Sequence, residues 1–196
     1  MLVLIIRCFR GLYMGFNLCG DVIYVLDAAA LFASYQLMLP HNSKAVTTKE
    51  VVEEVRDLDS RASLELSLSA GKLVIVDVPD KFLVEAVRVA GDLGEFSKLS
   101  KADISLTALM IMLVRVCGGV DVFVVTDDYS LQNIANYLGL RVLGVKRRTI
   151  DKVVKYVSVC RLCGYVDNTG LGVVCPVCGG FMSRRPSTVK SFGKCC

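Results

Sequence analysis

Short apolar stretches alternate with longer amphipathic segments over the first three quarters of the chain. The short stretches are rich in β-branched residues and read as buried strands, whereas the longer segments have apolar residues at helical spacing. Strands are predicted over residues 22–26, 73–78, 121–126 and 141–145, and helices over residues 28–38, 49–58, 59–70, 80–90, 101–116 and 129–138. This alternation predicts an α/β fold, in which a parallel sheet has helices on both faces.

A loop is predicted after the first helix. Residues 40–43, with the sequence Pro-His-Asn-Ser, have the composition of a turn and are expected to form a loop. Thr47 or Thr48 then follows as the expected N-cap of the helix 49–58.

The apolar stretches are too short or too interrupted to cross a membrane, although the mean hydropathy is +0.54. Residues 104–114 are bounded by Asp103 and Arg115 and are fewer than the roughly 20 that a spanning helix needs. The longer run 22–39 contains Asp27, which would cost about 2.5–3.5 kcal/mol at mid-bilayer. The first ten residues have no basic region before their apolar stretch and do not resemble a secretory signal. We therefore expect a cytoplasmic protein without a membrane partner.

Charge is divided unevenly along the chain. Residues 1–145 contain 13 basic and 17 acidic residues, whereas residues 146–196 contain 10 basic and only two acidic residues. The acidic part is suited to metal ions, and the basic part is suited to a polyanion such as RNA. A solvated basic tail without a ligand is the alternative for the second part.

Four cysteines form two closely spaced pairs, Cys160/Cys163 and Cys175/Cys178, in the segments CRLCG and CPVCG. Two thiolates three positions apart on a tight turn can bind one metal ion, and two such turns complete a tetrahedron. Because a segment this small has almost no core, metal binding would supply its folding energy. Zinc in a structural site is expected, although the spacing alone does not distinguish zinc from iron in a rubredoxin-like electron carrier.

Five acidic residues are candidates for a second metal site. Asp27 follows the strand 22–26, and Asp127 and Asp128 follow the strand 121–126, where open α/β sheets place their sites. Glu54 flanks the apolar stripe of the helix 49–58, and Asp103 lies in the first turn of the helix 101–116. Helix capping, the helix dipole or simple solvation would explain each of these residues singly.

Clustered carboxylates would require divalent cations. Two carboxylates about 4 Å apart repel each other by about 4 kcal/mol at an effective dielectric constant of 20. Oxygen ligands suit Mg²⁺ or Mn²⁺, which bind phosphates and activate water for attack on a phosphodiester. His41 is the sole histidine of the sequence, which excludes chemistry with paired histidines, and the motifs of P-loop, α/β-hydrolase and dinucleotide-binding proteins are absent.

The candidate acids lie in segments that resemble those of a known protein family. The segments TTKEVVEEVRD, LSKADISLTAL and VVTDDYSLQNIA are similar to those of PIN-domain nucleases, and the double CxxC segment that follows narrows the resemblance to the Nob-type endoribonucleases of archaea. The resemblance implies that Asp27, Glu54, Asp103 and either Asp127 or Asp128 bind Mg²⁺ or Mn²⁺, with assistance from Thr126. It also implies cleavage of precursor small-subunit (16S) rRNA to form its mature 3′ end, on the pre-small ribosomal subunit.

The expected organisation follows from both lines of argument. Residues 1–20 would be an N-terminal extension, 21–145 a PIN-like domain, 146–156 a basic linker, 157–183 a zinc ribbon and 184–196 a basic tail. The linker and the ribbon would bind RNA through Lys146, Arg147, Arg148, Arg161, Arg184 and Arg185. The alternatives are a non-catalytic RNA-binding assembly factor and a PIN-domain ribonuclease with another RNA substrate.

Overall fold

The computed structural model describes residues 6–7, 22–117 and 120–187. Within these residues, six parallel strands form one sheet in the order β1-β4-β3-β2-β5-β6. The strands are β1 (Ile6–Arg7), β2 (Val22–Leu26), β3 (Ser43–Thr47), β4 (Leu73–Asp77), β5 (Val122–Val125) and β6 (Arg141–Leu143). The parallel sheet confirms the predicted fold class, and part of the predicted N-terminal extension forms the edge strand β1.

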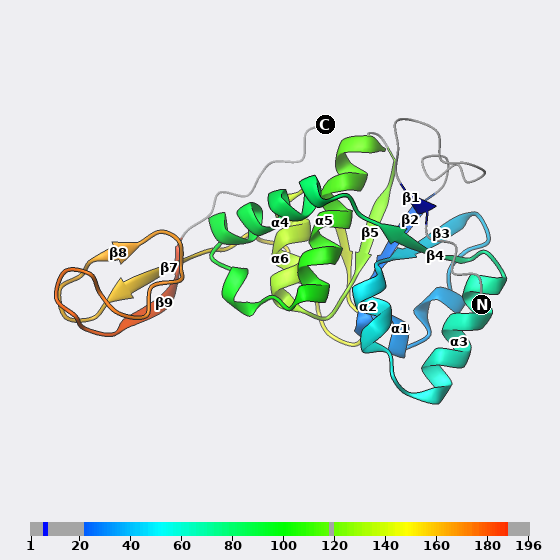
Figure 1. Cartoon of the computed structure of the whole chain (residues 1–196), viewed down its shortest axis with the longest axis horizontal. Coiled ribbons are helices and arrows are strands. Elements are labelled where there is room, and N and C mark those ends of the chain that lie inside the picture. Colours follow the sequence, from blue (N-terminus) through cyan, green and yellow to red (C-terminus); the bar gives the residue numbers. More distant parts are fainter. Residues whose placement is uncertain (1–5, 8–21, 118–119, 188–196) are drawn as a thin grey trace.

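Helices connect the strands and cover both faces of the sheet. They are α1 (Ala28–Phe32), η1 (Tyr35–Leu37), α2 (Lys49–Glu54), α3 (Leu58–Ser69), α4 (Asp80–Asp92), η2 (Phe96–Lys98), α5 (Lys101–Val116) and α6 (Tyr129–Tyr137). The chain moves from β2 through β3 to β4 in one direction and returns to β5 and β6 in the other. Right-handed crossovers therefore put the two series of helices on opposite faces. Figure 1 shows α4, α5 and α6 on one side of the strands and α1 and α3 on the other.

The core is centred on β2 and α5. Ile23, Val25 and Leu26 of β2 are fully buried, as expected for a central strand of a parallel sheet. Helix α5 is buried almost all round, because residues 105–113 all lie in the interior. No helix of the described residues is long and apolar enough to cross a membrane.

Three predictions of local structure are wrong. Residues 43–47 form β3, a strand that was not predicted and that pairs with both β2 and β4, and Ser43 belongs to it rather than to the loop 40–43. The predicted helix 28–38 is broken at Ser34, whose φ of 52° cannot continue a right-handed helix. The predicted helix 49–58 ends at Glu54 because Val55 has an extended conformation, and Asp57 caps the following helix.

The second module is a small antiparallel sheet of β7 (Lys155–Cys160), β8 (Val166–Asp167) and β9 (Met182–Ser187), with β7 in the centre. Figure 1 shows this sheet set apart from the α/β domain. The two parts meet where Tyr156 N–H donates to the Leu93 carbonyl (2.9 Å). Gly94 is required there, because its φ is +67° and a Cβ would lie 2.3 Å from the Tyr156 carbonyl oxygen.

The segment that joins the two parts is held along α6 by side-chain amides. Gln132 accepts from Ile150 N–H (3.0 Å), and Asn136 donates to the Ile150 carbonyl (2.8 Å). Asn133 exchanges two hydrogen bonds with the backbone of Val154. The predicted linker therefore follows a defined path on the surface of the domain.

Candidate active site and metal centre

The candidate acids surround the point where the direction of the chain reverses in the sheet. Strands β2 and β5 are neighbours there, and their connections leave in opposite directions. Asp27 follows β2 and Asp127 follows β5, so both lie at the carboxyl edge of the sheet. This is where open α/β sheets bind ligands.

Asp27 is the most buried of these acids, with 7% of its surface exposed. One carboxylate oxygen accepts from Ala30 N–H (2.7 Å) and caps α1. Burial raises the pKa of Asp27 to about 6, against the effect of hydrogen bonds from Thr126 and Ala30, and the charges of Asp127 and Asp103 raise the pKa further. Asp27 therefore combines a capping role with a place among other carboxylates.

Glu54 and Asp103 form the other half of the cluster. Burial raises the pKa of Glu54, and the negative charge of Asp103 raises it further, whereas Arg56 lowers it. Asp103 forms a capping box with Ser100, in which its carboxylate accepts from Ser100 N–H (2.8 Å). The negative charge of Asp103 raises the pKa of both Glu54 and Asp27, and the charge of Asp127 also raises the pKa of Asp27. The four carboxylates are therefore within electrostatic range of a neighbour.

Asp127 and Asp128 have different surroundings. Asp128 is exposed and caps α6, accepting from Ser130 N–H (2.6 Å) and Leu131 N–H (3.1 Å). Asp127 accepts from the backbone amides at the start of the basic segment: Val145 (2.8 Å), Lys146 (3.0 Å) and Arg147 (3.1 Å). Burial opposes ionisation of Asp127, but these amides dominate and lower its pKa. Asp127 is the member of the pair whose charge raises the pKa of Asp27.

The hydroxyl of Thr126 joins these residues directly. Thr126 is fully buried and accepts from Asp128 N–H (3.0 Å), and its hydroxyl lies close enough to Asp27 to lower the pKa of that carboxyl. Gln132 donates to the Thr126 carbonyl (2.9 Å), so the strand end is also connected to the linker. The assisting role that the resemblance implies for Thr126 stays a prediction.

The carboxylates fit a divalent cation in charge and chemistry. Within the described part of the chain, Asp27 and Asp103 form no ion pair with lysine or arginine, so a bound cation would neutralise them. Some oxygens of Asp103 and Asp127 are turned toward backbone amides. Among the described residues, the four cysteines have ligand atoms close enough together to hold one metal ion. The carboxylate oxygens of the acidic cluster do not converge on one point in this way.

The four cysteines do form such a site. Their Sγ atoms lie within 4.8 Å of one another, and Cys160 and Cys175 are buried while Cys163 and Cys178 are exposed. Backbone amides of Cys163 and Leu162 lower the pKa of Cys160 to about 6. The Tyr165 amide lowers the pKa of Cys163, but the thiols of Cys178 and Cys175 outweigh it and raise that pKa to about 12. A central cation would favour all four thiolates, so the site fits zinc.

The predicted RNA-binding residues fall into two groups. Lys146, Arg147, Arg148, Arg161 and Arg185 are exposed, as a phosphate-binding surface requires. Arg184 is instead half-buried between the two parts of the molecule, where its guanidinium donates to the Gly94 carbonyl (2.9 Å) and pairs with Glu95 (2.6 Å). Its RNA-binding role stays a prediction, whereas its contact with the α/β domain is a finding.

Glu95 is the residue that sequence reasoning missed. It is 2% exposed and accepts from Ser130, Asn133 and Arg184. These partners lie 35, 38 and 89 positions away, so no local pattern connects them with Glu95.

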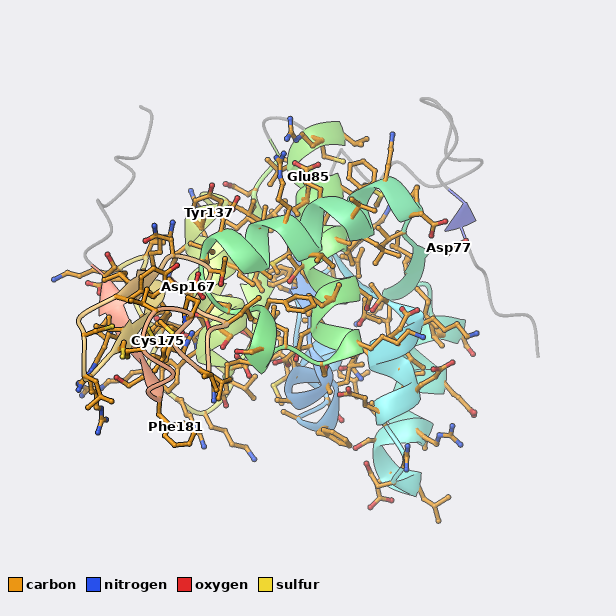
Figure 2. All side chains as sticks on the ribbon, turned by 60° about the vertical axis from the view of Figure 1, so that its left-hand side comes forward. Asp77, Glu85, Tyr137, Asp167, Cys175 and Phe181 are labelled. Carbon is orange, nitrogen blue, oxygen red and sulfur yellow. The ribbon has the colours of Figure 1, made fainter. Side chains whose placement is uncertain are left out.

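The ribbon side of the molecule has a second unexpected feature, a set of exposed apolar residues that includes Phe181 (79% exposed), labelled near Cys175 in Figure 2.

Comparison with known proteins identifies the family of the chain. Residues 24–113 match the family described as the PIN domain of ribonuclease. The chain is 39% identical to Endoribonuclease Nob1 of Pyrococcus abyssi over 74% of this chain and 86% of the relative. It is 35% identical to Endoribonuclease Nob1 of Archaeoglobus fulgidus over 82% and 89%. It is also 37% identical to Ribonuclease VapC3 of Aeropyrum pernix over 71% and 97%.

A parallel sheet with carboxylates at its switch point, followed by a four-cysteine ribbon, defines a PIN-domain endoribonuclease that carries a zinc-ribbon module. Identity with the Nob1 relatives extends over most of both chains. The chain belongs to the archaeal Nob1 endoribonuclease family.

Proposed function

We propose that this endoribonuclease cleaves precursor small-subunit (16S) rRNA and forms its mature 3′ end, acting on the pre-small ribosomal subunit in the cytoplasm. The proposal is supported by the likeness to Nob1 endoribonucleases over the α/β domain and beyond it. The basic residues after position 145 supply a surface for a polyanionic substrate.

The observation that carries the catalytic part is the position of Asp27 and Asp127 at the carboxyl ends of the neighbouring parallel strands β2 and β5. We assign Mg²⁺ or Mn²⁺ binding to Asp27, Glu54, Asp103 and Asp127, and capping of α6 to Asp128. A bound divalent ion supplies charge neutralisation at the phosphate and a more acidic water. Thr126 holds the carboxylate of Asp27 in place through its hydroxyl, and its own orientation is fixed by Asp128 N–H.

Zinc is assigned to Cys160, Cys163, Cys175 and Cys178, in a structural role. All four ligand positions of a tetrahedral ion are filled by thiolates, which leaves no open position for substrate. The ribbon then presents Arg161 and Arg185 to RNA, while Lys146, Arg147 and Arg148 bind phosphates closer to the acidic cluster.

The experiment is cleavage of a precursor rRNA fragment that contains the 3′ boundary of the small-subunit RNA. The intact chain should cut it in the presence of Mn²⁺ or Mg²⁺, and Asp27→Asn should abolish cleavage while RNA binding is retained. Asp80→Asn, at an exposed position of α4, is the matched control and should cut normally.

The similarity to Ribonuclease VapC3 favours one alternative, a PIN-domain ribonuclease with another RNA substrate. A structured RNA of equal length without the boundary sequence separates the two. Equal cleavage of both RNAs would overturn the proposed substrate. Binding of both RNAs without cleavage by the intact chain would favour a non-catalytic RNA-binding factor.

A further inference from the structure

A pocket of about 380 Å³ lies at the junction between the α/β domain and the ribbon. Its wall includes residues from α6, from the linker and from the ribbon, among them Tyr129, Asn133, Lys152, Tyr156 and Arg184. Pockets for small molecules usually have volumes of about 300–1,000 Å³, so this one can hold a group of modest size. We refer to it as the junction pocket.

The floor of the junction pocket is polar but already satisfied. Glu95 is buried there, and its carboxylate accepts from Ser130 (3.0 Å), Asn133 (2.8 Å) and Arg184 (2.6 Å). Arg184 also lies 3.4 Å from the centre of the Tyr156 ring. These groups fix the shape of the pocket, because each is held by two or more partners.

The rim of the pocket carries groups whose side chains are available. Lys98 and Lys152 are exposed and form no ion pair within the described residues, and Asp151 is the acid beside them. The Tyr129 ring is 53% exposed. Two free ammonium groups beside an exposed aromatic ring match a phosphate linked to an unstacked base, as in single-stranded RNA.

The short distance between the pocket and the acidic cluster also favours RNA as the ligand. Tyr129 is the first residue of α6 and directly follows Asp128, so its Cα lies within about 8 Å of the Cα of Asp127. A strand of RNA that reaches the acidic cluster would thus pass the mouth of the pocket with one of its nearest nucleotides.

We propose that the junction pocket binds one nucleotide of single-stranded RNA, with its base stacked on Tyr129 and its phosphate between Lys98 and Lys152. The inference rests on the proposed ribonuclease function and extends it by naming a substrate subsite. It explains why the ribbon is fixed against Gly94 and Glu95: the pocket exists only when both parts are in contact.

The test measures binding of a short fluorescein-labelled single-stranded oligoribonucleotide to the intact chain, by fluorescence anisotropy without added Mg²⁺ or Mn²⁺ and without chelator. Tyr129→Ala should weaken binding by about 5- to 150-fold, the usual effect of losing one stacked base, whereas Tyr129→Phe should bind like the parent. Lys98→Gln with Lys152→Gln should flatten the slope of log affinity on log salt by about 0.7 for the lost phosphate contact.

Lys72→Gln is the matched control, because Lys72 directly precedes β4 at the amino edge of the sheet, away from the pocket. It should leave the affinity unchanged, and the melting temperatures of all variants should match the parent. Competition by millimolar AMP that Tyr129→Ala abolishes would show that a single nucleotide suffices. A Tyr129→Ala chain that binds RNA as tightly as the parent would overturn the proposal, because the pocket would then make no contribution to RNA binding.

The result is separable from that of the proposed function. Tight oligoribonucleotide binding that depends on Tyr129, without cleavage of precursor rRNA, would support the subsite and reject the proposed substrate. Cleavage of precursor rRNA with no effect of Tyr129→Ala on binding would do the reverse.

Discussion

Arg184 of the ribbon forms an ion pair with Glu95 of the α/β domain at 2.6 Å, although the residues are 89 positions apart. The Glu95 side chain is almost fully buried, whereas Arg184 keeps 27% of its side-chain surface exposed. The same guanidinium donates to the Gly94 carbonyl and packs on the Tyr156 ring. This side chain therefore helps to fix how the four-cysteine ribbon meets the α/β domain.

Arg184→Ala should destabilise the junction by about 3 kcal/mol, since it leaves the Glu95 carboxylate buried without its cation. We expect faster proteolysis within residues 146–156 and faster hydrogen exchange at Tyr156. Arg185→Ala, the exposed neighbour on β9, should change stability by no more than about 0.5 kcal/mol. Equal protection of the linker in both variants would show that the contact contributes little.

Asp27→Asn should stabilise the metal-free protein at pH 8. The pKa of Asp27 rises from 3.8 to about 6 on folding, so its contribution to stability is greatest below pH 3.8 and falls as the pH rises through about 6. The asparagine escapes this loss and still caps α1, which gives a gain of about 3 kcal/mol at pH 8 and about half of that at pH 5.

Urea denaturation of the two chains at both pH values, with Asp80→Asn as the control, checks this expectation. Added Mn²⁺ should stabilise the parent chain more than the variant, because the ion binds the ionised carboxylate. A variant that is less stable than the parent at pH 8 would contradict the assignment of burial as the cause of the raised pKa.

Sequence reasoning located the strand ends of the site and missed what surrounds them. Residues 22–26 and 122–125 were recognisable because central parallel strands are continuous apolar runs. Residues 43–47, Ser-Lys-Ala-Val-Thr, lack such a run, and β3 is held in the sheet by neighbours on both sides, with Thr47 donating to the Leu26 carbonyl (2.9 Å). Tertiary contacts therefore decided what local composition did not.

The choice between Asp127 and Asp128 was likewise beyond the sequence. The two residues are adjacent and chemically identical, and both follow the same strand. Their difference arises from partners that are local for Asp128, in α6, and distant for Asp127, in the basic segment 18 to 20 positions away. The distant partners of Asp127 could not be predicted from the spacing of residues along the chain.

Cys175→Ser should remove the metal from the ribbon while the α/β domain stays folded. Loss of one of four thiolates weakens zinc binding, and a module with so small a core depends on the ion for its fold. We expect loss of bound zinc by mass spectrometry, weaker RNA binding and residual metal-dependent cleavage at high enzyme concentration. Val177→Ser, an exposed position within the same CxxC segment, should retain the ion; a variant pair with equal zinc content would reject Cys175 as a ligand.

Arg147→Ala combined with Arg148→Ala should weaken binding to all RNA sequences. Each lost phosphate contact flattens the slope of log affinity on log salt by about 0.7 for single strands, so one or two lost contacts should flatten it by roughly one unit. Asp103→Asn should abolish cleavage and leave this slope near its original value. An unchanged slope in the double variant would indicate that this part of the basic segment is solvated and contacts no RNA.

Asp127 should differ from the other acids because its carboxylate serves the basic segment as well as the cluster. It accepts from the amides of Val145, Lys146 and Arg147, which precede or carry predicted RNA-binding side chains. Asp127→Ala removes these hydrogen bonds and frees the segment, so we expect reduced cleavage together with weaker RNA binding and a flatter salt slope. Asp103→Asn, which leaves the segment in place, is the comparison. If Asp127→Ala abolished cleavage with RNA binding unchanged, Asp127 would act on the metal site alone, and the hydrogen bonds to the segment would have no part in holding RNA.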